Sequence, residues 1–169
     1  NITVDDQNLE SPDLVWIKNR DNADNHQLYD SVRGVQKVLV SDGTTNPVEA
    51  DAPRGLLNFN TNGFIVGEDG AVNRANQDYV AWTWKFGGAP SVANSGGATP
   101  TSGSIMIDGT ASTTTLATAD IYPDKASVNS TSKCGVMTYT SNSTLVTGDT
   151  IANPFGFVPD VMFIKKLTG

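Results

Sequence analysis

Residues 79–86 have the sequence YVAWTWKF, and this stretch is the most informative about the fold. Large apolar side chains occupy every second position. They are Val80, Trp82, Trp84 and Phe86. A period of two is typical of a β-strand that packs one face against a second layer. We therefore predict a sandwich strand in which Trp82 and Trp84 pack in the core and Tyr79, on the opposite face, is exposed.

The remaining composition favours the same class. The 169 residues are rich in Gly, Ser, Thr, Asn and Asp, which disfavour helix interiors and supply turns. Further short β-rich runs are separated by such turns. They are 14–18, 26–33, 36–40, 56–59, 64–66, 104–108 and 134–141. Asn62-Gly63 is the strongest hairpin signal. We predict an all-β chain, a β-sandwich or jelly roll, without a convincing helix.

Charge and cysteine content narrow the function classes. The formal net charge of −7 disfavours binding to nucleic acid through a basic face. No apolar run approaches the length that spans a bilayer, so we expect no membrane insertion. The single cysteine, Cys134, excludes an intrachain disulfide framework and is most simply a packed small residue.

One motif occurs twice. Residues 12–18 are PDLVWIK, and residues 159–165 are PDVMFIK. A true repeat would make the second copy the first strand of another module. The other interpretation is a single domain whose first and last strands look alike, as neighbours in one sheet. The residue pattern alone leaves both open.

Composition also divides the chain. Residues 1–88 carry the clearest strands and are predicted to form the main part of the sandwich module. Residues 89–103 are Gly-, Ser- and Pro-rich and are predicted to be a loop or linker. Residues 104–157 contain either the remaining strands or a small second β unit. Residues 158–169 are the possible start of a following repeat.

Four segments resemble a module found in proteins of tailed bacteriophages, especially marine and cyanobacterial ones. They are Pro12–Lys18, Asn25–Gly34, Phe59–Phe64 and Tyr79–Gly88. A weaker similarity covers 126–143 and 155–166. The resemblance implies a non-enzymatic virion structural protein, located in a tail fibre, an appendage or the capsid surface, with a concanavalin-like jelly roll. It also implies partners among other copies of the chain and neighbouring virion proteins.

Host attachment is a further expectation of this resemblance, through a lectin-like glycan-binding surface. Four residues are candidate ligand contacts: His26, the only histidine, and its neighbour Asp24, with Tyr29 and Tyr79 as exposed aromatics. For His26, an ordinary hydrogen-bonded side chain is the simpler interpretation. A polysaccharide depolymerase is a third alternative, which would need two carboxylates facing each other across a cleft.

Other residues are expected to be structural. Asp30 shares a strand face with Leu28, and a buried carboxylate there needs a partner such as Arg33 or a backbone turn. Trp16 is expected to fill the core. No cofactor is expected, although Arg20–Asn25 and Gly67–Asn73 concentrate oxygen ligands of the kind that Ca²⁺ accepts. Solvated turns are the simpler interpretation of both loops.

Overall fold

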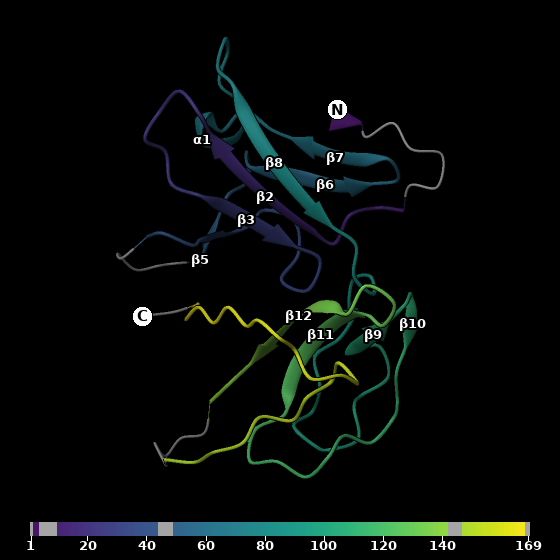
Figure 1. The fold of residues 1–169 in the computed structure, drawn as a ribbon. Coiled ribbons are helices and arrows are strands. Elements are labelled where there is room, and N and C mark those ends of the chain that lie inside the picture. Colours follow the sequence, from purple (N-terminus) through teal and green to yellow (C-terminus); the bar gives the residue numbers. More distant parts are fainter. Residues whose placement is uncertain (1, 4–9, 44–48, 142–146, 168–169) are drawn as a thin grey trace. The chain divides into compact units, whose positions relative to one another are not determined.

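A computed structural model describes residues 2–3, 10–43, 49–141 and 147–167. In these ranges the regular structure is almost entirely β, which confirms the predicted class. The chain divides into two compact units (Figure 1). Unit 1 comprises Asn1–Lys85 and Met162–Gly169, and unit 2 comprises Phe86–Val161.

Unit 1 contains an antiparallel five-stranded sheet. In spatial order its strands are β5 (Glu49–Asp51), β4 (Lys37–Val40), β3 (Gln27–Asp30), β2 (Leu14–Asn19) and β8 (Tyr79–Trp84). β2 lies between β3 and β8, so the N-terminal copy of the repeated motif supplies an interior strand of this sheet.

A three-stranded antiparallel sheet completes unit 1. Its order is β1 (Ile2–Thr3), β7 (Gly63–Val66) and β6 (Leu56–Asn60). One core joins the two sheets: Val15 and Tyr29 from the larger pack with Leu56 and Phe64 from the smaller. This gives unit 1 a sandwich-like character. The finer prediction of a concanavalin-like jelly roll stays a prediction.

Two local features of unit 1 follow from turn and capping chemistry. The predicted hairpin at Asn62-Gly63 is confirmed: both residues have positive φ, 73° and 145°. One short helix, α1 (Gly70–Asn73), was not predicted. The Asp69 side chain caps it by accepting a hydrogen bond from the backbone N–H of Ala71, 2.9 Å away.

The core lies on one face of the five-stranded sheet, and it is not the face that carries the tryptophans. Along β2, Val15 and Ile17 are buried, whereas Trp16 is only half-buried. The predicted core positions of Trp16, Trp82 and Trp84 are therefore wrong. Strand alternation determines which residues share a face, but it does not determine which face a second sheet covers.

Unit 2 contains a four-stranded sheet. Its order is β10 (Thr110–Ala111), β9 (Ile105–Ile107), β11 (Pro123–Asn129) and β12 (Cys134–Tyr139). β9 and β11 pair in parallel, and the other pairs are antiparallel. Ile105, Ala126 and Val128 form its core. β11 was not predicted, because its sequence PDKASVN contains no aromatic residue and, in Val128, a single β-branched one.

The Gly- and Ser-rich residues 89–103 lie within unit 2. Asn94 is 9% exposed and organises this loop. Its side-chain amide donates to the carbonyl oxygen of Gly97 at 3.1 Å, and its carbonyl accepts from the backbone N–H of Thr101 at 3.1 Å. Hydrogen bonds of this kind hold an irregular segment in place without a large apolar residue.

Candidate interaction surface

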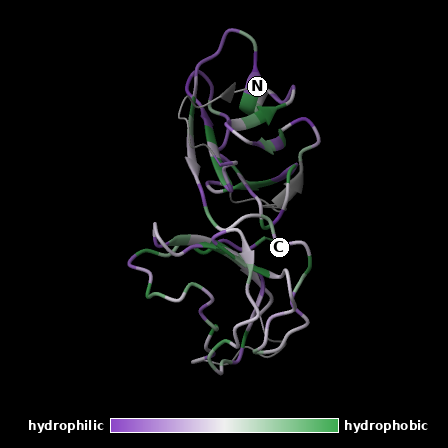
Figure 2. Cartoon of the chain, turned by 90° about the vertical axis from the view of Figure 1, so that its right-hand side faces the viewer, coloured by the Kyte–Doolittle hydropathy of each residue, from purple (hydrophilic) through white to green (hydrophobic). Residues whose placement is uncertain are grey.

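The outer face of the five-stranded sheet, away from the core of unit 1, carries a row of apolar side chains. Its members face each other across the paired strands and are Leu14, Trp16, Leu28, Leu39, Val80, Trp82 and Trp84. We call this set the tryptophan face. Figure 2 colours the described residues by hydropathy, including the strands that carry this face.

The tryptophans of this face have defined neighbours. Trp16 lies opposite Trp82 in the strand register, with ring centroids 5.4 Å apart and planes tilted by 57°. Trp82 and Trp84 are 44% and 37% exposed. Large aromatic rings with this exposure on a sheet face are typical of surfaces that bind partners.

His26 lies at one end of this aromatic cluster. Its Nδ1 accepts a hydrogen bond from Nε1 of Trp16 at 2.7 Å, and the two rings meet nearly edge to face, 5.4 Å apart. The backbone N–H of His26 donates to Asp42 at 2.9 Å. The imidazole therefore orients Trp16, as the simpler of the two interpretations expected.

Neither predicted tyrosine is exposed. Tyr29 is completely buried in the core, and burial, followed by the negative charge of Asp69, raises the pKa of its hydroxyl well above its ordinary value. Tyr79 lies on the core side of β8. Its hydroxyl donates to the carbonyl of Gly70 at 2.7 Å and accepts from the N–H of Arg74 at 2.8 Å, so it fixes the helical turn.

Asp24 belongs to a polar network around Asn19, a residue that sequence reasoning missed. Asn19 is fully buried, and its amide nitrogen donates to Asp24 at 2.8 Å and to Gln77 at 2.7 Å. Its amide oxygen accepts from the backbone N–H of Asp21 at 2.9 Å. The available signal was a polar residue at an inward-facing strand position, which must find partners.

This network also bears on the calcium alternative. Within the described ranges, no group of three or more His, Cys, Asp or Glu side chains is placed to hold a metal ion. In the loop 20–25, the carboxylate of Asp21 accepts from the backbone N–H of Asp78 at 2.6 Å. The polar side chains here tie two loops together.

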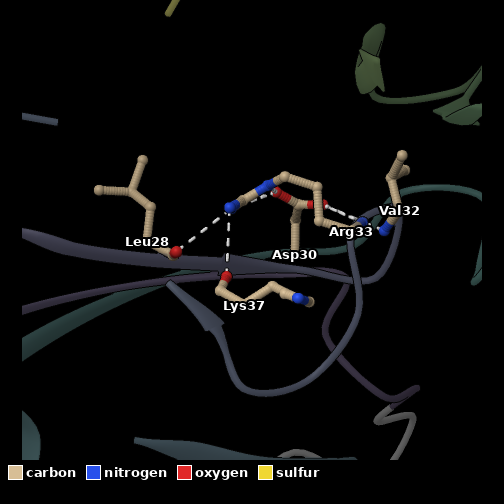
Figure 3. Close-up of polar contacts among 5 residues, drawn as sticks. All are labelled: Leu28, Asp30, Val32, Arg33 and Lys37. Carbon is tan, nitrogen blue, oxygen red and sulfur yellow. Dashed lines mark hydrogen bonds and ion pairs between the residues drawn. The ribbon is translucent and has the colours of Figure 1, made fainter. Parts of the chain in front are cut away.

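Asp30 and Arg33 form a buried ion pair, which confirms the prediction for both (Figure 3). One carboxylate oxygen accepts from the backbone N–H groups of Val32 and Arg33, at 3.1 and 2.9 Å. The other accepts from Nε and Nη2 of Arg33, each at 2.6 Å. The guanidinium also donates to the carbonyls of Leu28 and Lys37, so both predicted kinds of partner are present.

A second buried carboxylate is Asp13, the aspartate of the motif at residues 12–18. It is 3% exposed and pairs with Lys85 at 3.0 Å. Its backbone N–H donates to the carbonyl of Trp84, and its carbonyl accepts from the N–H of Ser31, both at 2.8 Å. Asp13 thus joins the start of β2 to the strands on either side.

These features define an all-β, sandwich-like protein with an exposed aromatic sheet face. The chain belongs to the family described as Domain of unknown function (DUF7483), which it matches over residues 7–119. That range covers most of unit 1 and the first part of unit 2. Searches of curated proteins and of solved structures gave no match. Among the described residues, no helix has the length and apolar character needed to cross a bilayer.

Proposed function

We propose that this chain is a non-enzymatic structural module of a tailed-phage virion, in a tail fibre, an appendage or the capsid surface, and that it works by contact with other copies of itself. The observation that carries the proposal is the tryptophan face. The resemblance of residues 11–88 to phage modules supplies the virion context. Membership of DUF7483 adds no activity to this argument.

The tryptophan face has the chemistry of a protein-binding surface. Tryptophan is among the residues that dominate binding energy at protein interfaces, because its ring supplies a large rigid area at low entropic cost. Covering one such side chain contributes about 1.5–3 kcal/mol. Two exposed indoles beside half-buried Leu14 and Leu28 therefore form a suitable centre for a stable contact.

Several charged groups in unit 1 support a structural role. Asp30 is held by Arg33, Asp13 by Lys85, and Asp24 by Asn19. Each of these carboxylates joins segments of the fold. The geometry therefore favours a structural role for these residues. They stabilise a rigid sheet that presents an apolar face.

Sedimentation velocity over a range of concentrations tests the contact between copies. We expect the full chain to self-associate, and Trp82→Ala/Trp84→Ala to shift it to monomer. Thr83→Ala is the matched control, because Thr83 is exposed on the same strand but on the opposite face. A wild-type chain that stays monomeric at every concentration would contradict the contact. Mass spectrometry of purified particles tests the location, and absence of the chain from them would contradict it.

A host-surface glycan is the second candidate, favoured by the exposure of Trp82 and Trp84. Sugar rings present apolar faces that stack on indoles. A glycan array with and without Ca²⁺ separates this candidate from the first. A glycan whose binding depends on Trp82 and Trp84, with a monomeric chain, would favour the lectin-like function.

A further inference from the structure

The chain ends in an exposed apolar stretch, residues 158–167, with the sequence VPDVMFIKKL. We call it the C-terminal segment. It forms no strand and is drawn as a yellow coil in Figure 1. Phe163 is 94% exposed, and Val158, Val161, Met162 and Ile164 are between 68% and 87% exposed. Consecutive exposed apolar residues of this kind mark a surface that another structure covers.

The sequence of this segment is that of an interior strand. Residues 159–165, PDVMFIK, follow the pattern of residues 12–18, PDLVWIK, which contain most of β2. Pro, Asp, Ile and Lys recur at the same spacing, and the three positions between them are apolar in both. The two motifs nevertheless differ in burial at every position except the lysine, since Lys18 and Lys165 are both half-buried.

β2 shows what each position of the motif does. Val15 and Ile17 are 0% and 2% exposed and face the core of unit 1. Their counterparts in the C-terminal segment are Met162 and Ile164. The residues between, Leu14 and Trp16, are half-buried on the outer face, and their counterparts are Val161 and Phe163.

The aspartate of the motif gives a second, independent argument. Directly before β2 it is Asp13, which is buried and paired with Lys85, the residue that follows β8. Burying a carboxylate is costly unless a partner is provided. The counterpart, Asp160, is exposed and begins a similar apolar run. An aspartate at this position suits a strand that gains a cationic neighbour when its sheet forms.

We propose that the C-terminal segment is the interior strand of a second sheet of the same kind, built by residues that follow it in the same polypeptide. β2 lies between β3 and β8, so a strand equivalent to β2 has to be in place before the two strands beside it can pair with it. A strand that belongs to the same polypeptide as its neighbours is always available for this pairing. The alternative in which the two motifs are neighbours in one sheet is wrong, because β3 and β8 occupy both sides of β2. This proposal does not depend on the proposed function.

One position departs from the pattern. Lys166 stands where β2 has Asn19, the fully buried centre of the network that ties the loop 20–25 to Gln77. We therefore expect the second sheet to hold the equivalent loops by other contacts. A test built from this chain should restore the asparagine.

The experiment is a fused chain in which residues 1–165 are followed directly by a second copy of residues 19–88. Hydrogen exchange is measured by mass spectrometry at residues 160–165, in the fused chain and in the unfused chain. We expect the backbone amides of this stretch to exchange about 100-fold more slowly in the fused chain, because they gain neighbouring strands on both sides.

Two variants with nearly equal exposure in the unfused chain serve as a matched pair. Met162 is 69% exposed and corresponds to buried Val15, whereas Val161 is 68% exposed and corresponds to half-buried Leu14. In the fused chain, Met162→Asp should abolish the slow exchange, and Val161→Asp should retain most of it. In the unfused chain both substitutions should leave the unfolding transition unchanged.

The outcomes separate the alternatives. Fast exchange in the fused chain, or equal loss with both variants, would overturn the proposal. Concentration-dependent slowing in the unfused chain would also overturn it, in favour of strand addition to a second copy. If the fused chain is insoluble, the triple variant Leu14→Val/Val15→Met/Trp16→Phe provides the test instead. It places the side chains of residues 161–163 at the equivalent positions of β2. Cooperative unfolding of that variant supports the proposal, and an unfolded chain contradicts it.

Discussion

The ion pair between Asp30 and Arg33 allows the sharpest prediction about stability. Replacing Asp30 by alanine removes the acceptor of four hydrogen bonds and leaves the guanidinium buried, since the side chains of Asp30 and Arg33 are only 4% and 5% exposed. Breaking a buried pair by removing one partner costs about 3–5 kcal/mol. The carbonyls of Leu28 and Lys37 still accept from Arg33, so we expect a value near the lower end, about 3 kcal/mol.

Urea unfolding followed by tryptophan fluorescence is the appropriate measurement. Trp16, Trp82 and Trp84 are the three tryptophans of the chain, and all lie in unit 1. The signal therefore reports the unit that contains Asp30, even if the two units unfold separately. Glu68, an exposed carboxylate in the same unit, provides the control, because Glu68→Ala should change the free energy of unfolding by less than about 0.5 kcal/mol.

A second substitution tests the reason for the loss. In Asp30→Ala/Arg33→Met the unpaired charge is gone, so stability should recover by about 1–2 kcal/mol relative to Asp30→Ala. A loss below about 1 kcal/mol in the single variant would refute the claim that the pair is buried and required. A double variant less stable than Asp30→Ala would show that Arg33 stabilises the fold through its backbone carbonyl contacts instead.

Three further predictions concern groups that the structure places in strained or titratable settings. The pKa of Tyr29 is raised in the fold, so the unfolded chain loses its proton first, and stability should fall as the pH rises above about 10, less so in Tyr29→Phe. Gly87→Ala should destabilise unit 2 by about 2 kcal/mol or more, seen as a lower melting temperature, because the added methyl group would overlap the carbonyl of Met106. Hydrogen bonds from Thr150 lower the pKa of Asp120, so this contact should be lost as the pH falls below about 4, and NMR titration of the Thr150 amide should report it; no change would contradict the contact.

Local patterns predicted the strands and turns of unit 1 well, because their information is contained in adjacent residues. A β-rich run predicted β2, alternation predicted β3 and β8, and Asn62-Gly63 predicted the hairpin. The choice of buried face could not be predicted. Both faces of β8 carry apolar or neutral side chains, and the core side is determined by where β6 and β7 pack. The residues that determine which face of β8 is buried are therefore distant from β8 in the sequence.

The candidate surface was predicted incompletely for the same reason. Exposed aromatics were expected at Tyr29 and Tyr79, whereas Trp82 and Trp84 are the exposed ones. Side chains alternate between the two faces of a strand with a period of two. A prediction that assigns the core to the wrong face therefore buries the tryptophans and exposes the tyrosines. Asp30 and Arg33, by contrast, are three residues apart, and their pairing needed only the local chain.

The two copies of the repeated motif show how far local sequence can determine β-structure. Residues 14–18 form a strand because β3 and β8 supply hydrogen-bonding partners on both sides, whereas residues 161–165 carry a closely similar pattern and form none. Backbone groups of a strand are satisfied by other strands, unlike those of a helix, which are satisfied within the same segment. The difference between the copies therefore lies in their surroundings. A pattern that buries Val15 and Ile17 where neighbours exist leaves Met162 and Ile164 in solvent where none are present, and supplying such neighbours should convert the second copy into a strand.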